Sequence, residues 1–274
     1  MAYPSPRALL AKHGLRAKKS WGQNFLGDEA ALDQIARLAV EREGDRVVEL
    51  GAGLGHLTSR LLARGGRVVA VERDRDMVRV LRGELGDAVE IVEADAARLD
   101  YAALAGPPAA RIAVVGNLPY HLTSPILFSL LDQAKSISRA VLLVQREVAE
   151  RLAARPGTKD WGQVSVLLQR EADVSIERIV PPGAFVPPPR VESAVVRAAF
   201  RPPLEPVADP ARLRRIVKAG FAQRRKTLAN ALRSARVVGP EPLADALARA
   251  GIDGGRRGET LTVAEWAALE RALD

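Results

Sequence analysis

The feature that most constrains the fold is an alternation, over residues 46 to 144, of short runs rich in β-branched residues with longer amphipathic stretches. Parallel strands need long connections, usually helices, so this alternation is typical of a parallel sheet covered by helices. The pattern predicts an α/β fold with a mostly parallel seven-stranded sheet and helices on both faces. The expected strands are Arg46–Leu50, Arg67–Glu72, Val89–Glu93, Ile112–Val115, Arg139–Val144, Ser175–Val180 and Ser193–Phe200.

The alternation of strand-like and helical patterns ends at the last two expected strands. A proline-rich segment, Pro181–Pro189, joins them without a helical interval, so we expect an antiparallel pair at one end of the sheet. Beyond the break at Arg201-Pro202-Pro203 only helical periodicity remains, over Pro210–Gly220, Lys226–Ser234, Pro242–Ala250 and Val263–Leu273. The sequence predicts an N-terminal arm at 1–27, an α/β domain at 28–202 and a small all-helical domain at 203–274.

The positive charge of the chain is concentrated at its two ends. Residues 1–25 carry a net charge of +5, residues 26–200 carry −2 and residues 201–274 carry +5, within a total of +8. A near-neutral centre between basic ends is typical of a protein that binds a polyanion such as nucleic acid. Surplus arginine also keeps a protein soluble, so charge alone leaves both interpretations open.

Several classes of protein are disfavoured by residues that the sequence lacks. It has no cysteine, which excludes disulfides, thiolate metal sites and a cysteine nucleophile. Its histidines, His13, His56 and His121, are not spaced like zinc ligands, so we expect no metal. No apolar run approaches the roughly 18 residues of a membrane span, and the N-terminus lacks the apolar stretch of a signal peptide. We expect a cytoplasmic monomer without a membrane partner.

A glycine-rich turn follows the first expected strand. The segment Val47–Gly55 runs from that strand through Gly51 and Gly53 into a helical pattern. Glycine permits a positive φ and close approach of a ligand to the backbone. His56 stands where the dinucleotide fingerprint has its third glycine. The turn therefore suits a nucleoside without phosphates, and a turn without any ligand is the alternative.

Two acidic residues stand where the next two strands end. Glu72 closes the second strand, where its carboxylate can accept both ribose hydroxyls. Asp95 follows the third strand, where it can accept from an adenine amino group. Each alone is usually a solvated acid, but together with the glycine turn they line one crevice at the carboxyl edge of the sheet. This arrangement resembles the Rossmann-like class I S-adenosylmethionine methyltransferases.

The tetrapeptide Asn117-Leu118-Pro119-Tyr120 follows the fourth strand and suits the binding of a methyl acceptor. An adenine amine is a poor nucleophile because its lone pair is delocalised into the ring. The Asn117 amide oxygen and a backbone carbonyl of the proline-stiffened loop can both accept from the amine and orient it. Tyr120 offers a face on which a flipped base can stack. An ordinary turn is the alternative, but the tetrapeptide is similar to the motif of the N6-adenine methyltransferases.

Two other segments are candidates for contact with RNA. Phe185 begins the proline-stiffened segment Phe185–Val191 and is expected to stack on the opposite face of the base, while Arg190 contacts phosphate. The alternative places Phe185 in the core. The run Arg224-Arg225-Lys226 begins a helical pattern and is expected to contact phosphate, with a solvated helix face as the alternative.

Three further stretches, Lys18–Leu26, Gln145–Leu152 and Phe221–Leu228, narrow the family. With the loops above, they closely resemble the bacterial small-subunit ribosomal RNA adenine dimethyltransferases, over nearly the whole chain and in the family's order. The resemblance implies dimethylation of the N6 amines of two adjacent adenosines in a hairpin near the 3′ end of small-subunit RNA, within the immature 30S particle. It makes 28–202 the catalytic domain and 203–274 the RNA-recognition domain.

The resemblance also implies a set of contacts with S-adenosylmethionine, whose product is S-adenosylhomocysteine. Asn24 and Leu26 belong to the basic arm, which would fold over the cofactor. The complete set is Asn24, Leu26, Gly51, Glu72, Asp95 and Asn117.

Two other functions stay open. The erythromycin-resistance methyltransferases, which modify large-subunit RNA, share the same core, although the basic run at 224–226 and the segment Gln23–Phe25 favour the small-subunit type. Alternatively, the protein acts chiefly as a ribosome-assembly factor whose binding role outweighs catalysis.

Overall fold

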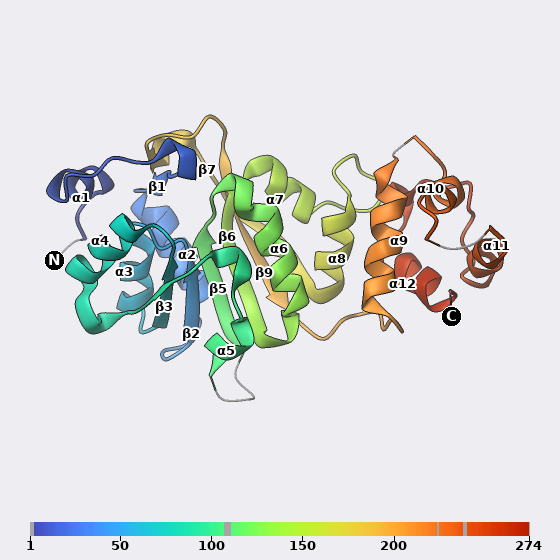
Figure 1. The fold of residues 1–274 in the computed structure, drawn as a ribbon, viewed down its shortest axis with the longest axis horizontal. Helices are drawn as coiled ribbons and strands as arrows, with labels where there is room; N and C mark the ends of the chain where they lie inside the picture. Colours follow the sequence, from blue (N-terminus) through green and yellow to red (C-terminus); the bar gives the residue numbers. More distant parts are fainter. Residues whose placement is uncertain (1–2, 107–110, 224, 238–239, 274) are drawn as a thin grey trace. The chain divides into compact units, whose positions relative to one another are not determined.

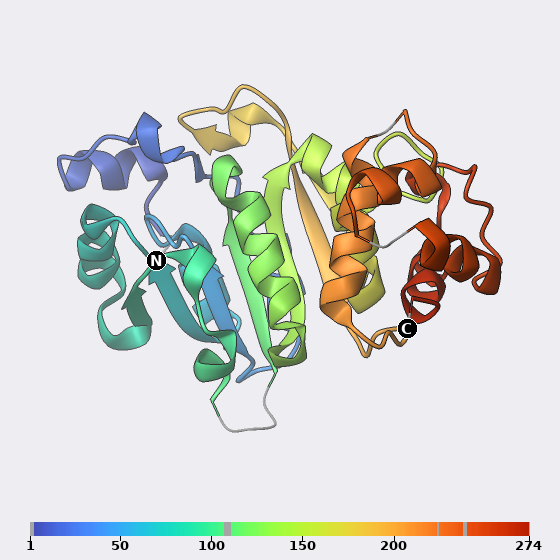
Figure 2. The same ribbon diagram turned by 45° about the vertical axis from the view of Figure 1, so that its right-hand side comes forward.

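The computed structural model describes residues 3–106, 111–223, 225–237 and 240–273. The chain divides into two compact units. The first comprises Met1–Ala149 and Asp173–Phe200, and the second comprises Glu150–Ala172 and Arg201–Asp274. Figures 1 and 2 show the strands gathered in the first unit, with the end of the chain forming helices only.

A seven-stranded sheet with the order β4-β3-β2-β5-β6-β9-β7 forms the centre of the first unit. The pairs β2–β3, β2–β5, β3–β4 and β5–β6 are parallel, whereas β9 runs antiparallel to β6. The sequence therefore predicts the fold class correctly, and β7 and β9 lie together at one end of the sheet as expected. The strands are β2 (Arg46–Leu50), β3 (Arg67–Glu72), β4 (Glu90–Glu93), β5 (Ile112–Asn117), β6 (Ile137–Gln145), β7 (Ala172–Val180) and β9 (Ser193–Phe200).

Helices cover the sheet because the central strands are apolar on both faces. One core cluster joins α2 and α3 to alternate strand residues such as Val47, Val115 and Leu143. On the other face α6 lies in front of β5 and β6 (Figures 1 and 2). Helix α2 begins after Asp28 and α4 after Asp74, and each of these side chains caps its helix by accepting a backbone N–H. The helices are α2 (Glu29–Ala39), α3 (His56–Ala63), α4 (Arg75–Leu85), α5 (Tyr101–Ala105), α6 (Thr123–Asp132) and α7 (Arg146–Leu152).

The N-terminal arm is a packed part of the first unit. It contains α1 (Pro6–Lys12), the short 3-10 helix η1 (Lys19–Trp21) and β1 (Phe25–Leu26). Leu9 and Leu10 of α1 join a buried cluster with Phe25, Leu54 and Met77. Strand β1 pairs antiparallel with β8 (Phe185–Val186) of the proline-rich connection, with Leu26 opposite Phe185. The sequence alone predicts neither α1 nor the pairing of these two-residue strands.

The described residues of the second unit form mainly helices. It contains α8 (Gln163–Glu171), α9 (Pro210–Ala222), α10 (Leu228–Ser234), α11 (Pro240–Arg249) and α12 (Val263–Arg271). Its centre is built on the buried Trp266, whose ring lies so close to Gly220 that a Cβ there would clash with it. The buried Trp161 donates its indole N–H to Leu261 O at 3.0 Å. Residues 150–172, which fall inside the expected 28–202 domain, therefore pack with the C-terminal helices.

Among the helices of the described ranges, none is both long and apolar enough to cross a membrane.

Candidate active site

The glycine-rich turn connects β2 to α3 at the carboxyl edge of the sheet. Gly51 has a φ of 71° and Gly53 a φ of 56°, values that residues with a Cβ rarely adopt. A Cβ on Gly53 would also lie 3.1 Å from the ring of Phe25, which comes from the N-terminal arm. The backbone N–H of Gly53 donates to Glu72 Oε2 at 2.8 Å. The turn is thus fixed from one side by the arm and from the other by the end of β3.

Glu72 is the acid at the end of β3, and its carboxylate is held by backbone groups. Oε1 accepts from the N–H groups of Arg73 and Asp74, each at 2.8 Å. Burial raises the pKa of Glu72, while these backbone hydrogen bonds act in the opposite direction. Glu72 is 8% exposed and lines the pocket described below. Each carboxylate oxygen has more than one acceptor position, so Oε2 can accept a further hydrogen bond from a ligand.

Glu49 is a second buried carboxyl that the sequence analysis did not single out. It lies on β2 with 2% exposure, and its Oε2 accepts from the Thr58 hydroxyl at 2.6 Å. Burial raises the pKa of Glu49 to about 8, with a smaller contribution in the same direction from Glu72. The signal in the sequence is a carboxyl placed inside an otherwise apolar strand, Val47–Leu50. Because its pKa lies near 8, the Glu49 carboxyl beside the pocket is mostly uncharged at neutral pH.

Asp95 lies between the end of β4 and the short 3-10 helix Ala96–Arg98. Its Oδ1 accepts from Ala97 N at 3.0 Å, which caps a short 3-10 helix, and its Oδ2 pairs with the Arg73 guanidinium at 3.3 Å. The side chain of Asp95 is 27% exposed and that of Arg73 is 63% exposed. This carboxylate is therefore accessible at the edge of the sheet, next to Glu72 in the strand order.

The segment Asn117–Tyr120 leads from β5 into α6. Asn117 Nδ2 donates to the backbone carbonyl of Asn24 at 2.7 Å, so the donor end of this amide is engaged by the N-terminal arm. Leu118 is buried, and its N–H donates to Leu143 O at 3.1 Å, which ties the loop to β6. The Tyr120 hydroxyl lies 3.0 Å from Ser193 Oγ at the start of β9. The loop is therefore fixed to the N-terminal arm, to β6 and to β9.

The arm carries Asn24 and Leu26 to the same place. Lys18 Nζ pairs with Asp74 Oδ1 at 2.7 Å and with Asp76 Oδ2 at 2.6 Å. Gln23 Nε2 donates to Asp74 Oδ2 at 2.7 Å. We call these contacts of Lys18 and Gln23 with the start of α4 the Asp74 latch. Asp74 is 3% exposed and lies two residues beyond Glu72, so the latch links the arm directly to the end of β3.

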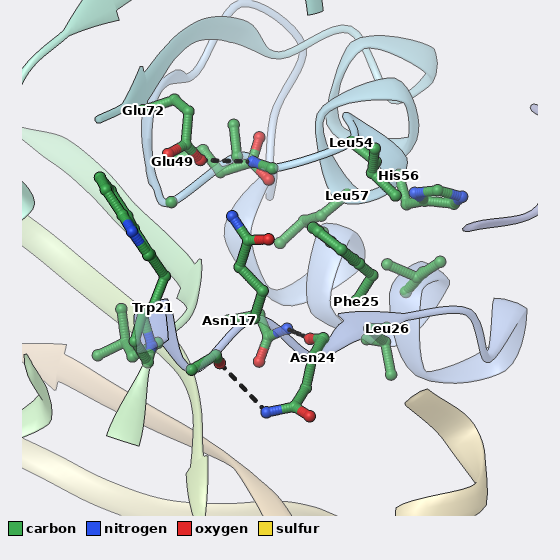
Figure 3. A pocket seen from close by; sticks show the side chains of 18 of the residues that line it. Trp21, Asn24, Phe25, Leu26, Glu49, Leu54, His56, Leu57, Glu72 and Asn117 are labelled. Carbon is green, nitrogen blue, oxygen red and sulfur yellow. Dashed lines mark hydrogen bonds between the residues drawn. The ribbon is translucent and has the colours of Figure 1, made fainter. Parts of the chain in front are cut away.

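These segments enclose a pocket (Figure 3). It is lined by most of the residues that the sequence analysis proposed, namely Asn24, Leu26, Gly51, Gly53, Glu72, Asn117, Leu118, Pro119 and Tyr120. Asp95 lines an adjoining second pocket. The two pockets share Trp21, Gly51, Glu72, Leu118 and Pro119. The structure thus brings the proposed cofactor and acceptor segments together at the carboxyl ends of β2, β3 and β5.

The expected role of Phe185 as an exposed wall needs a correction. The pairing of β8 with β1 turns this residue into the core, where it is 3% exposed and belongs to the cluster that contains Leu26 and Ile35. In this structure the ring is buried in the same cluster as Leu26 and is not available for stacking. The sequence alternative, a buried Phe185 on a rigid connection, describes its position.

Of the residues proposed for RNA contact, Arg190, Arg225 and Lys226 line neither pocket. Arg190 is exposed in the first unit, in the connection between β8 and β9. Arg225 and Lys226 are exposed in the second unit, and Arg224 lies outside the described residues. The expected helix over 226–234 begins later, at Leu228, because Thr227 is its N-cap and accepts from Asn230 N. Lys226 therefore belongs to the turn before α10.

Among the described residues, no group of three or more histidine, aspartate or glutamate side chains is able to hold a metal ion.

The fold and the site define a methyltransferase of the Rossmann-like class. The family model for ribosomal RNA adenine dimethylase matches residues 14–274. A ribosomal RNA small subunit methyltransferase A of Anaeromyxobacter sp. is 74% identical, with 99% of this chain and 98% of that protein covered. One of Myxococcus xanthus is 55% identical, with 98% and 95% covered. The chain therefore belongs to the ribosomal RNA adenine dimethylase family.

Solved structures agree with this fold. A dimethyladenosine transferase of Plasmodium falciparum matches with a TM-score of 0.75 at 23% identity, covering 89% of this chain and 95% of that one. The 23S rRNA methyltransferase ErmE matches with a TM-score of 0.68 at 29% identity, covering 92% and 100%. The first similarity supports the fold alone, and the second shows that the same architecture occurs in an enzyme that modifies a different ribosomal RNA.

Proposed function

We propose that this protein transfers methyl groups from S-adenosylmethionine to the N6 amines of two adjacent adenosines in a hairpin near the 3′ end of small-subunit ribosomal RNA. The observation that carries the proposal is the orientation of the Asn117 amide. Its Nδ2 donates to Asn24 O, which leaves its oxygen as the free acceptor at the pocket. An acceptor fixed in this way suits an amine and does not suit a carbonyl or a phosphate.

The donor set of the pocket fits S-adenosylmethionine. Glu72 would accept from the ribose hydroxyls, and Asp95 would accept from the adenine amino group in the adjoining pocket. Asn24 and Leu26 would cover the ligand from the arm, and Gly51 and Gly53 would let it approach the backbone. When bound, the cofactor supplies an activated methyl group on a sulfonium.

The chain itself would contribute positioning and hydrogen bonding. The Asn117 oxygen and a loop carbonyl hold the two N–H bonds of the adenine amine, so that the nitrogen lone pair leaves the ring plane and points at the methyl group. Tyr120 would stack on the base, with its orientation set by Ser193. Leu118 and Pro119 exclude water around the amine, since Leu118 is 2% exposed.

The proposal that the substrate is small-subunit RNA rests on the names of the similar proteins. The similar proteins of Anaeromyxobacter and Myxococcus are both named as small-subunit enzymes. This favours small-subunit RNA, within the immature 30S particle, over the large-subunit substrate of the erythromycin-resistance type. Arg190, Arg224, Arg225 and Lys226 are proposed as phosphate contacts, and the protein would act as a monomer in the cytoplasm.

The test is transfer of labelled methyl from S-adenosylmethionine to small subunits that lack the modification, with the nucleoside product identified by mass spectrometry. We expect N6,N6-dimethyladenosine in small-subunit RNA. Asn117→Ala should lower the turnover by about 10²–10³-fold, as loss of one preorganised group does, and should still bind S-adenosylhomocysteine. Label found only in large-subunit RNA, or full turnover by Asn117→Ala, would contradict the proposal.

A further inference from the structure

Trp21 occupies an unusual position in the site. It is 38% exposed, whereas the other two tryptophans of the chain, Trp161 and Trp266, are at most 1% exposed and lie in the second unit. Trp21 lines both pockets and therefore stands at the boundary between them. Figure 3 shows its ring on the same side of the first pocket as Glu72. An exposed indole at a polar pocket is a large apolar surface that a flat ligand can cover.

Residues of the arm before and after Trp21 in the chain hold this indole in place. Lys18 and Gln23 flank Trp21, and both bind Asp74 at 2.7 Å in the Asp74 latch. Lys18 Nζ also lies 5.6 Å from the centroid of the indole. Because Asp74 is buried and caps α4, the latch is anchored on a rigid element. The indole is thus positioned in advance in the lining of the second pocket, which lowers the entropic cost of using it for binding.

Arg73 connects Trp21 with the acid of the second pocket. Its guanidinium carbon lies 5.6 Å from the Trp21 ring, and its Nη1 lies 3.3 Å from Asp95 Oδ2. All three side chains line the second pocket, together with the apolar Leu118, Pro119, Leu122 and Ile126. The Arg73–Asp95 pair is exposed enough that separating it costs little. A ligand amino group can therefore replace Arg73 at Asp95.

We propose that Trp21 and Arg73 form a clasp over the second pocket, and that the indole stacks on the adenine ring of the cofactor. The inference rests on the proposed function. The planar guanidinium and the indole both favour a flat π system, and the apolar side chains named above offer the rest of a slot for it. The methionine part of the ligand has no such surface, so the clasp recognises the nucleoside half.

The first test uses the tryptophan itself as a reporter. Titration of the full-length protein with S-adenosylhomocysteine should quench and shift the tryptophan fluorescence, because only Trp21 lies at the site. The same titration of Trp21→Phe should show no such change, since Trp161 and Trp266 are buried in the second unit. Unchanged fluorescence of the wild-type protein at saturation would contradict the clasp.

The second test measures affinity by calorimetry with two ligands, S-adenosylhomocysteine and 5′-methylthioadenosine. Base–aromatic stacking is worth enough that Trp21→Ala should weaken both ligands by about tenfold or more, while Trp21→Phe should retain most of the affinity. Arg73→Ala should weaken both by a few-fold. Lys19→Ala is the matched control, because Lys19 is an exposed neighbour on the same arm and lines neither pocket.

The outcomes separate this inference from the proposed function. If the wild-type protein does not bind S-adenosylhomocysteine, the proposed function fails and the clasp fails with it. If the wild type binds and Trp21→Ala binds both ligands within twofold of it, the clasp alone is wrong. If Trp21→Ala loses S-adenosylhomocysteine but keeps 5′-methylthioadenosine, the indole contacts the amino-acid half and the assignment to adenine is overturned.

Discussion

At the scale of single residues, the site depends on carboxyls whose surroundings differ sharply. Glu72 is held by three backbone N–H groups, whereas Glu49 on the neighbouring strand has the Thr58 hydroxyl as its hydrogen-bond donor. Asp95 at the edge of the sheet is partly exposed and pairs with Arg73. Residue type alone does not distinguish these acids, because their ionisation is set by burial and by the donors around them.

The buried Glu49 predicts a dependence of stability on pH. Burial raises its pKa from 4.5 to about 8, so the folded protein retains a proton that the unfolded chain has already lost. The free energy of unfolding should therefore fall as the pH rises from about 4.5 through 8. Glu49→Gln should flatten this fall and be the more stable protein at pH 9, by on the order of a few kcal/mol.

Urea unfolding at several pH values measures this effect. Glu43→Gln is the matched control, because it removes one exposed carboxylate from the segment just before β2. It should leave the dependence of stability on pH as it is in the wild type. A Glu49→Gln protein whose stability falls between pH 5 and 9 as steeply as that of the wild type would show that Glu49 is already ionised in the folded state.

At the scale of elements, the N-terminal arm is the part that completes the site. Helix α1 packs Leu9 and Leu10 into a buried cluster, and β1 pairs with β8. Between these two anchors, the Asp74 latch fixes the segment that carries Trp21 and Asn24. Polar contacts hold the arm on either side of the latch as well, since Lys12 pairs with Glu84 and the Asn24 carbonyl accepts from Asn117.

Lys18→Met tests the latch. It removes the cation that binds Asp74 and Asp76 but keeps an unbranched apolar side chain, and Asp74 can still cap α4. We expect a three- to tenfold weaker affinity for S-adenosylhomocysteine, because a looser arm must be ordered on binding. Thermal unfolding should change little, since a partly exposed ion pair contributes about 0–1 kcal/mol.

Limited proteolysis of the arm, with and without the ligand, gives an independent readout of Lys18→Met. The variant without ligand should be cut between α1 and β1 faster than the wild type, and ligand should restore protection. Equal cutting rates would indicate that the packing of α1 and β1 alone holds the arm. Lys12→Met is the control, since Lys12 pairs with Glu84 away from the pocket.

At the scale of the whole molecule, chemistry and charge are divided between segments. The site is built entirely from the first unit, whereas residues 201–274 carry +5 of the total net charge of +8. Within the second unit the buried tryptophans and Gly220 stabilise a helical core, and the basic Arg225 and Lys226 stay exposed in a turn. This division is expected of an enzyme in which one part performs the reaction and another selects the RNA.

A double variant, Arg225→Ala with Lys226→Ala, tests this division. Loss of two phosphate contacts should weaken binding to small-subunit RNA and reduce the slope of log K against log salt by about 2. Affinity for S-adenosylhomocysteine should be unchanged, because neither residue lines a pocket. Filter binding over a series of salt concentrations measures the slope.

Lys135→Ala is the control for the salt experiment. Lys135 is exposed just before β6, at the amino end of a strand parallel to β5, whereas the site lies at the carboxyl ends. Its loss should leave the salt slope unchanged. A double variant at 225 and 226 with the slope of the wild type would show that the basic turn is a solvated surface.

The sequence by itself determined the α/β fold, the bounds of β2, β3 and β9, the glycine turn and the acids at the strand ends. These features follow from local periodicity and from the rule that parallel strands end at one edge, so a linear pattern contains them. Tertiary structure alone decided the burial of Phe185, the packing of the arm and the placement of residues 150–172 with the second unit. Each depends on a contact between segments far apart in the chain, such as Leu26 with Phe185 or Trp161 with Leu261, and no local pattern specifies such a contact.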